Sequence, residues 1–137
     1  MHGVVRFFQT VHGVLVAVDV NGLPTMYKTC ENSVFGFHIH GGNQCTGDIN
    51  DVFSNAMSHY TSVNCNHPEH SGDLPPLFAN HGFAFSVFLT NRFSLRDVIG
   101  KTMIIHEKPD DFITQPSGNA GKKIACGVIK SRKEIVK

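Results

Sequence analysis

The chain contains seven short runs of β-branched and other apolar residues, and none of them has a convincing helical period. Short runs bounded by clusters of Gly, Pro, Asn and Ser are typical of antiparallel sandwiches and barrels. We therefore expect an all-β protein with one helical turn in the connection 92–100. The predicted strands are Val4–Gln9, Val14–Val20, Val34–His40, Leu74–Ala79, Phe83–Thr90, Thr102–His106 and Ile124–Ile129.

Composition excludes several classes of protein. The 137 residues suffice for one domain with a real core, so we expect a single domain over residues 1–137. Apolar residues make up 41% of the chain and charged residues 17%, which excludes a disordered chain. A net charge of +1 indicates no nucleic-acid partner, and the lack of a long apolar run indicates no membrane partner. We find no signal peptide, which leaves both the cytoplasm and export of a mature form open.

Two long polar segments, Gly41–Gly72 and Glu107–Lys123, interrupt the predicted strands. A long segment without a strand or helix period inside a small domain is usually either functional or disordered. Metal ligands within the first segment favour a function, because a bound ion would order it. We expect two long functional loops.

Two histidines alternate with two apolar residues in the third predicted strand. Side chains on a strand alternate between faces, so His38 and His40 point one way while Phe37 and Ile39 point into a core. Two imidazoles side by side on a rigid strand can chelate zinc or copper. Alone, such a pair is more often solvated or hydrogen-bonded, so the other histidines decide its meaning.

The remaining histidines supply two sets of ligands. His67, His70 and Asp73 lie three residues apart, and a closed tetrahedral zinc site needs one more ligand, which His59 can supply. A second all-nitrogen set combines His106 with the pair on the third strand. That set also lacks one ligand, and the second ring nitrogen of His59 can complete it. Dense imidazole sites of this kind suit copper.

Four motifs in this order resemble the copper–zinc superoxide dismutase family. They are Gly36–His40 (GFHIH), His106–Asp111 (HEKPDD), Gly118–Gly121 (GNAG) and Ile124–Ile129 (IACGVI). The resemblance covers nearly the whole chain. It implies a Greek-key, immunoglobulin-like β-sandwich or barrel, with a copper ion and a zinc ion as cofactors.

The resemblance also implies specific roles for individual residues. Asp110 would join His38 to His67 and fix both rings, and Cys45 would form a disulfide with Cys126. His59 would bridge the two metals. The implied copper ligands are His38, His40, His59 and His106, and the implied zinc ligands are His59, His67, His70 and Asp73.

The activity implied by the resemblance is the conversion of superoxide into oxygen and hydrogen peroxide by a Cu(II)/Cu(I) cycle. Zinc would play a structural and tuning role, and His59 would deliver a proton. Where the family has a guiding arginine, this chain has Lys123, which keeps the positive charge but loses the planar fork. The alternatives are a non-catalytic relative that stores or delivers metal, and a zinc-dependent hydrolase, for which no protease motif is present.

The family's first strand has no counterpart before Val4–Gln9. An unpaired strand edge is a template for association, so we expect self-association there, as a homodimer or a larger assembly. Cys30 and Cys65 have no place in the resemblance, and the alternatives for them are a bond to each other, free thiols or binding of adventitious metal. We expect Phe83, Phe85 and Phe93 to be core residues, and His2, His12 and His81 to be surface residues.

Overall fold

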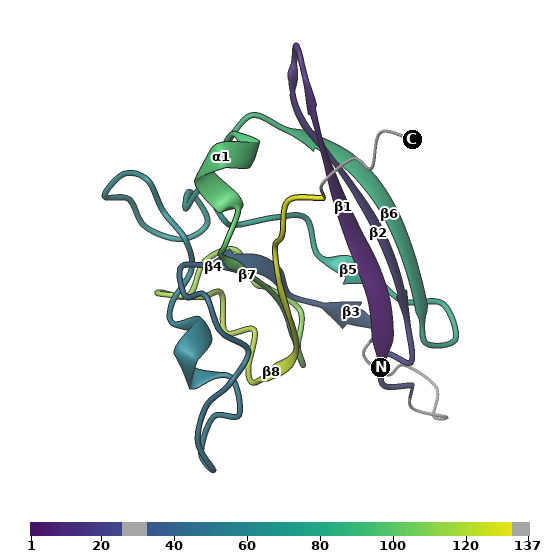
Figure 1. Cartoon of the computed structure of the whole chain (residues 1–137). Coiled ribbons are helices and arrows are strands. Elements are labelled where there is room, and N and C mark those ends of the chain that lie inside the picture. Colours follow the sequence, from purple (N-terminus) through teal and green to yellow (C-terminus); the bar gives the residue numbers. More distant parts are fainter. Residues whose placement is uncertain (26–32, 133–137) are drawn as a thin grey trace.

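The computed structural model describes residues 1–25 and 33–132, which form an all-β protein, as predicted (Figure 1). One α-helical turn, α1 (Leu95–Val98), lies in the connection predicted to hold one, and a 3-10 turn, η1 (Ser54–Ala56), lies in the first long loop. The described strands are β1 (His2–Thr10), β2 (Gly13–Asn21), β3 (Val34–Phe35), β4 (Phe37–His40), β5 (Leu77–Phe78), β6 (Phe83–Thr90), β7 (Thr102–His106) and β8 (Lys123–Val128).

Strands β1, β2 and β6 form one antiparallel sheet, in that order. The β1–β2 hairpin runs in register from Thr10↔Gly13 to His2↔Asn21, so both strands are slightly longer than predicted. Every second residue of β2 is a valine, and a pleated strand turns alternate side chains to the same face. The buried face of β2 therefore consists of Val14, Val16, Val18 and Val20.

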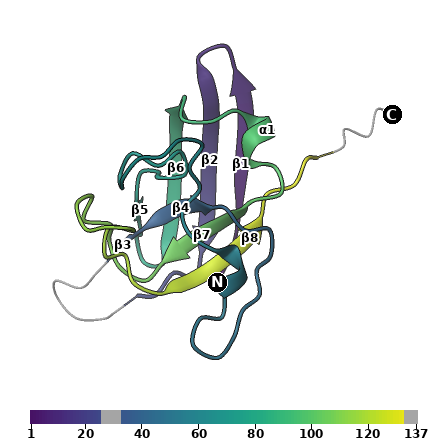
Figure 2. The same cartoon turned by 90° about the vertical axis from the view of Figure 1, so that its left-hand side faces the viewer.

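A second antiparallel sheet consists of β4, β7 and β8, and β3 pairs separately with β5. Figure 2 shows β4, β7 and β8 running obliquely across the first sheet. Phe37 and Ile39 from β4 and Ile105 from β7 pack with the β2 valines between the layers. The chain leaves the first sheet after β2 and returns as β6 beside it, as a Greek-key connection does. The predicted sandwich is confirmed.

The third predicted strand, Val34–His40, is in fact two strands that meet at Gly36. Residues before the break pair with β5, and residues after it pair with β7. A Cβ atom on Gly36 would lie 2.9 Å from the Cβ atom of Ala120, so only glycine fits. The Gly36 N–H donates to Lys108 O at 2.8 Å, and its carbonyl accepts from the His106 N–H at 2.8 Å. The break thus fastens the start of β4 to the end of β7.

The expectation for the phenylalanines is partly wrong. Phe93 is buried, as predicted, but the side chains of Phe83 and Phe85 are 38% and 65% exposed. The inner face of β6 begins with the buried Ala84 and includes the partly buried Phe88, because these residues stand in register with the buried valines of the neighbouring strand β2. Alternation correctly separates the two faces of β6 but does not say which face is buried.

Strand β1 lies at the edge of its sheet. Among residues 1–25 and 33–132, its ladder hydrogen bonds run to β2 alone, so its other edge carries no strand. Strand β5 is shorter than predicted, because Pro75 and Pro76 precede it and proline cannot donate to a ladder. The described helices are all too short and too polar to cross a bilayer.

Candidate metal centre

Strand β4 places two of the predicted site residues. His38 and His40 lie on the face opposite the core, while Phe37 and Ile39 pack into the core. All four side chains are buried, so the histidine face is covered as well. The cover is the first long loop, which follows β4 and forms bridges from His38 to Asp73 and from His40 to His59.

The first group of ligand atoms comes from His38, His40, His59 and His106, and these atoms all lie within 4.8 Å of one another. His106 is the last residue of β7, where the register with β8 shifts, and this irregularity lies next to the site. His59 comes from the loop. All four side chains are buried. The structure therefore brings together residues that are up to 68 positions apart in the sequence.

Hydrogen bonds fix which ring nitrogens in this group carry lone pairs. The Nδ1–H of His40 donates to Met57 O at 2.7 Å, and the Nδ1–H of His106 donates to Gly121 O at 3.0 Å. Each neutral ring then has a lone pair on Nε2. The two Nε2 atoms face each other at 3.2 Å, with no proton available between them. Two lone pairs held at this distance are the arrangement that a shared cation stabilises.

The second group consists of His59, His67, His70 and Asp73. Oδ1 of Asp73 lies 2.7 Å from Nδ1 of His59. Its Oδ2 lies 3.1 Å from Nδ1 of His67 and 3.2 Å from Nδ1 of His70. Ligands at about 2.0 Å from a tetrahedral ion lie about 3.3 Å apart. The observed spacings are close to the edges of such a tetrahedron. His59 belongs to both groups, with Nδ1 in this one and Nε2 in the other.

Several buried ring nitrogens have no hydrogen-bond partner among the described residues. They are His38 Nδ1, His59 Nε2, His67 Nδ1 and His70 Nδ1. A buried polar atom without a partner is costly, by about 1–3 kcal/mol. Every one of these atoms points into one of the two groups. The donor set therefore fits two adjacent transition-metal ions, which would satisfy the unpartnered lone pairs.

Asp110 connects the two groups through hydrogen bonds. Its carboxylate accepts from Nε2–H of His38 at 2.7 Å and from Nε2–H of His67 at 2.8 Å. The N–H of Phe112 donates to the same carboxylate at 2.7 Å. Burial alone would raise the pKa of Asp110, but these hydrogen bonds outweigh it and lower the pKa to about 2. The ionised Asp110 thus holds both rings with Nδ1 free.

Burial keeps His38, His40 and His106 neutral. It lowers the pKa of His40 to about 2 and that of His106 to about 4, and it lowers the pKa of His38 as well. The neighbouring imidazoles contribute in the same direction. A neutral imidazole has the lone pair that a metal ligand needs, so the protein environment favours ligation near neutral pH.

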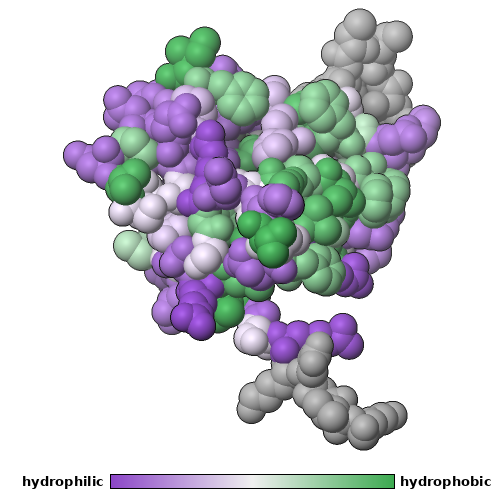
Figure 3. Space-filling view, turned by 90° about the horizontal axis from the view of Figure 1, so that it is seen from above, coloured by the Kyte–Doolittle hydropathy of each residue, from purple (hydrophilic) through white to green (hydrophobic). Residues whose placement is uncertain are grey.

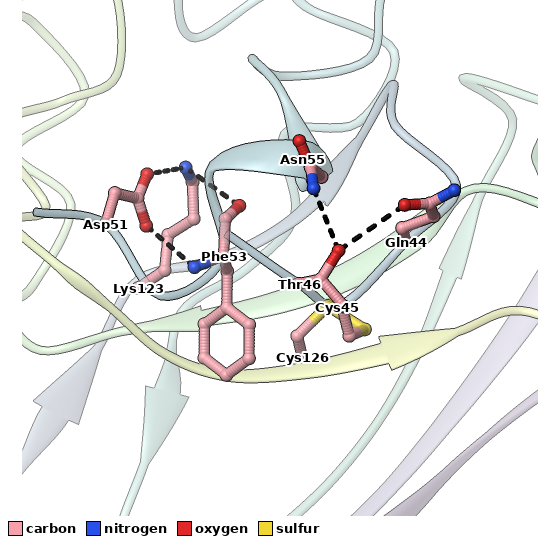
Figure 4. The surroundings of a disulfide bond; sticks show 8 residues. All are labelled: Gln44, Cys45, Thr46, Asp51, Phe53, Asn55, Lys123 and Cys126. Carbon is pink, nitrogen blue, oxygen red and sulfur yellow. Dashed lines mark hydrogen bonds and ion pairs between the residues drawn. A yellow bond between two sulfur atoms is a disulfide. The ribbon is translucent and has the colours of Figure 1, made fainter. Parts of the chain in front are cut away.

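A disulfide between Cys45 and Cys126 ties the first long loop to β8, which confirms the predicted pair. Figure 4 shows this bond beneath the loop segment that leads to η1. The two cysteines are separated by 81 positions. The bond therefore fixes the loop that covers β4 against the second sheet.

Lys123, the first residue of β8, lies opposite His106 in the ladder. Its ammonium donates to the carboxylate of Asp51 at 2.5 Å and to Phe53 O at 3.4 Å (Figure 4). The Lys123 hydrogen bond is the main cause of a lowered pKa for Asp51. The sequence did not point to Asp51, because the partners are 72 residues apart. The candidate guiding cation is therefore neutralised by an anion of the first loop.

Two further side chains hold the second group in place and were not found from the sequence. Gln115 accepts from the His67 N–H at 2.9 Å and donates to His67 O at 2.6 Å. Arg92 donates to Pro68 O at 2.6 Å and to His70 O at 3.1 Å. Both residues lie in other loops, so no local spacing could have indicated them.

The residues left outside the predicted sites mostly behave as expected. His2, His12 and His81 are exposed, which confirms them as surface residues. Cys65 is a free thiol that lies near Thr61 and donates to Glu69 O. Cys30 lies outside the described residues, and of the alternatives expected for Cys65 the structure has the free thiol.

The protein is thus an antiparallel sandwich that buries two groups of potential metal ligands, with one member in common. The family model described as copper/zinc superoxide dismutase (SODC) matches residues 1–129. The chain belongs to the copper/zinc superoxide dismutase family.

Curated relatives agree with this assignment. The chain is similar to superoxide dismutase [Cu-Zn] 2 of Aquifex aeolicus, at 33% identity over 93% of this chain and 78% of the relative. It is also similar to superoxide dismutase [Cu-Zn] of Legionella pneumophila, at 35% identity over 93% and 77%.

A solved structure of a SOD-like protein from Bacillus subtilis has the same fold. It is a double mutant in which a tyrosine and a proline are each replaced by histidine. It superposes with a TM-score of 0.77 at 28% identity, covering 94% of this chain and 89% of that one.

Proposed function

We propose that this protein is a superoxide dismutase that converts superoxide into oxygen and hydrogen peroxide. The observation that carries the proposal is the pair of four-residue groups that share His59 and are lined with unpartnered lone pairs. Bound copper would supply one-electron exchange with superoxide through a Cu(II)/Cu(I) cycle, and bound zinc would supply a fixed positive charge.

The residues divide into two ligand sets. We infer that His38, His40 and His106 hold copper together with His59. The zinc set is His59, His67, His70 and Asp73. The four-imidazole set lacks thiolate and carboxylate, which suits copper, and the set with a carboxylate suits zinc. Asp110 orients one ring of each set.

His59 is the candidate proton donor. Its ring has one nitrogen in each group, and Nε2 has no protein partner among the described residues. A proton held at Nε2 would face the space enclosed by the first group, where peroxide must be protonated. Asp73, bonded to Nδ1 at 2.7 Å, holds the ring in this orientation.

We infer that Lys123 attracts the superoxide anion to the first group. It lies opposite His106, and its side chain is 14% exposed. The bond to Asp51 weakens that attraction, because the pair carries no net charge. The expected consequence is a slower encounter with superoxide than for a protein with an unpaired cation at this position.

The second candidate function is that of a non-catalytic metal-binding relative. The SOD-like name of the Bacillus subtilis protein favours it. Both functions require the same metal groups, and dismutation separates them.

The test is superoxide dismutation by the protein loaded with copper and zinc, assayed beside His40→Ala. We expect activity in the parent and a loss of at least about a hundredfold in the variant. His81→Ala, an exposed histidine outside both groups, is the matched control and should keep full activity. A parent that binds both metals but does not dismute superoxide would establish the non-catalytic function instead.

A further inference from the structure

The outward face of β1, β2 and β6 is largely apolar, although it faces solvent. We call it the outer face, and Figure 3 shows hydrophobic residues gathered on the side of the molecule that carries this sheet. Residues that stand in register across the sheet form rows on this face, and the central rows combine residues from all three strands. The large apolar side chains that are between 38% and 65% exposed on it are Val4, Phe8, Phe83, Phe85, Val87 and Leu89.

The apolar area of this face lies at the upper end of what a monomer usually leaves exposed. With about 200 Å² per aromatic side chain, its three phenylalanines expose about 300 Å². The three aliphatic side chains bring the apolar area to roughly 500 Å², at the upper end of the patches found on monomers. A standard interface buries about 800 Å² per partner, and the intervening β2 residues and the polar ends of the rows supply the remainder. The face is thus large enough for a stable dimer.

Two charges lie within the apolar rows, and they have opposite signs. Arg6 stands in register with Ala17, and Asp19 stands in register with Val4, so the charges occupy adjacent rows on adjacent strands. Both are exposed, and neither has an ion-pair partner in the part of the chain that the structure describes. One cation beside one anion is the simplest self-complementary pattern, because a two-fold axis between them exchanges their positions.

We propose that the outer face packs against the same face of a second copy of this chain, with Arg6 of each copy opposite Asp19 of the other. The two-fold axis of this dimer passes through the midpoint between Arg6 and Asp19 and crosses the strands at a steep angle. The strands of the two copies then cross each other at a large angle, as in orthogonal sheet packing. The dimer lies on the side of the sandwich away from the histidine groups. It therefore does not rest on the proposed dismutase function. It uses the face of the first sheet, not the open edge of β1.

The test is sedimentation velocity over a concentration series. The parent should be a dimer, and Phe85→Ser should weaken the dimer by at least about tenfold. Arg6→Asp alone places aspartates on both sides of the contact, and Asp19→Arg alone places arginines there. Each should weaken its own homodimer by at least about tenfold.

The decisive experiment mixes the two charge variants. Arg6→Asp and Asp19→Arg together restore opposite charges at both contacts, so native mass spectrometry should show the heterodimer in preference to either homodimer. Ile113→Ser and Arg96→Asp, exposed positions elsewhere, are the matched controls and should leave the parent dimer intact. A parent that is monomeric at millimolar concentration would overturn the proposal. So would a dimer that is indifferent to Phe85→Ser and to charge reversal, which would place the contact on another surface such as the β1 edge.

Discussion

The sheet of β1, β2 and β6 and the histidine side of the molecule bury different kinds of group. The first sheet buries valines against the core and needs no long loop to do so. The histidine side buries seven polar ligand side chains, several of whose nitrogens have no partner among the described residues. Burying such atoms is unfavourable unless something binds them.

Stability and the proposed function are therefore placed in separate halves of the molecule. Hydrophobic burial stabilises the first sheet, whereas the histidine side is held by a disulfide, by the hydrogen bonds of Asp110 and by the metal ions that we propose it binds. Removing those supports should therefore damage the histidine side and spare the sheet. The following predictions test that separation.

The largest expected effect is that of removing the disulfide. Replacing Cys45 and Cys126 by Ser should lower the free energy of unfolding by roughly 4 kcal/mol, since the bond closes a loop of 81 positions. Urea unfolding of the metal-free protein measures the loss. Hydrogen exchange should show lost protection around η1 and His59 but not in β2. Equal loss of protection in β2 would contradict the separation of the two halves.

The metal-free protein should lose stability as the pH falls from about 6.5 toward 4. Burial lowers the pKa of His106 to about 4 and that of His40 to about 2, whereas histidines in the unfolded chain titrate near 6.5. Below pH 6.5 the unfolded chain therefore binds more protons than the folded chain, so the free energy of unfolding decreases. His106 alone accounts for roughly 3 kcal/mol over this window.

Urea unfolding of the metal-free protein at about pH 7.5 and about pH 4.5 measures this effect. His12→Ala, an exposed histidine, should show the same decline as the parent. A stability that is unchanged between the two pH values would mean that the buried rings are not neutral.

The smallest effect concerns the charge at Lys123. Asp51→Asn removes the anion bonded to Lys123, so superoxide encounter should rise about two- to fivefold at low salt and fall back at high salt. The second-order rate constant of dismutation against ionic strength is the measurement. Asp48→Asn makes the same charge change in the same loop without touching Lys123, and it should have less effect. Equal gains in both variants would show that only net charge matters.

The sequence predicted the histidine side better than the exposed sheet. Alternation placed His38 and His40 opposite Phe37 and Ile39, and the resemblance to the family implied that His106 joins these histidines and that Cys126 pairs with Cys45. The first prediction succeeded because strand alternation is a local rule, and the second succeeded because the family resemblance covers residues that are far apart in the sequence.

What could not be predicted depends on contacts between distant segments. The break at Gly36 follows from the approach of Ala120, and the neutralisation of Lys123 follows from Asp51. Phe85 is exposed because it lies on the face of the sheet opposite the β2 valines. No local sequence pattern indicates any of these three features.

The central claim is that His59 belongs to both ligand groups. The most direct test is the metal content of His59→Ala after loading with copper and zinc and exhaustive dialysis, beside His40→Ala and His70→Ala. We expect His59→Ala to lose both metals, His40→Ala to lose copper alone and His70→Ala to lose zinc alone. A His59→Ala protein that retains a full complement of either metal would contradict the shared ligand.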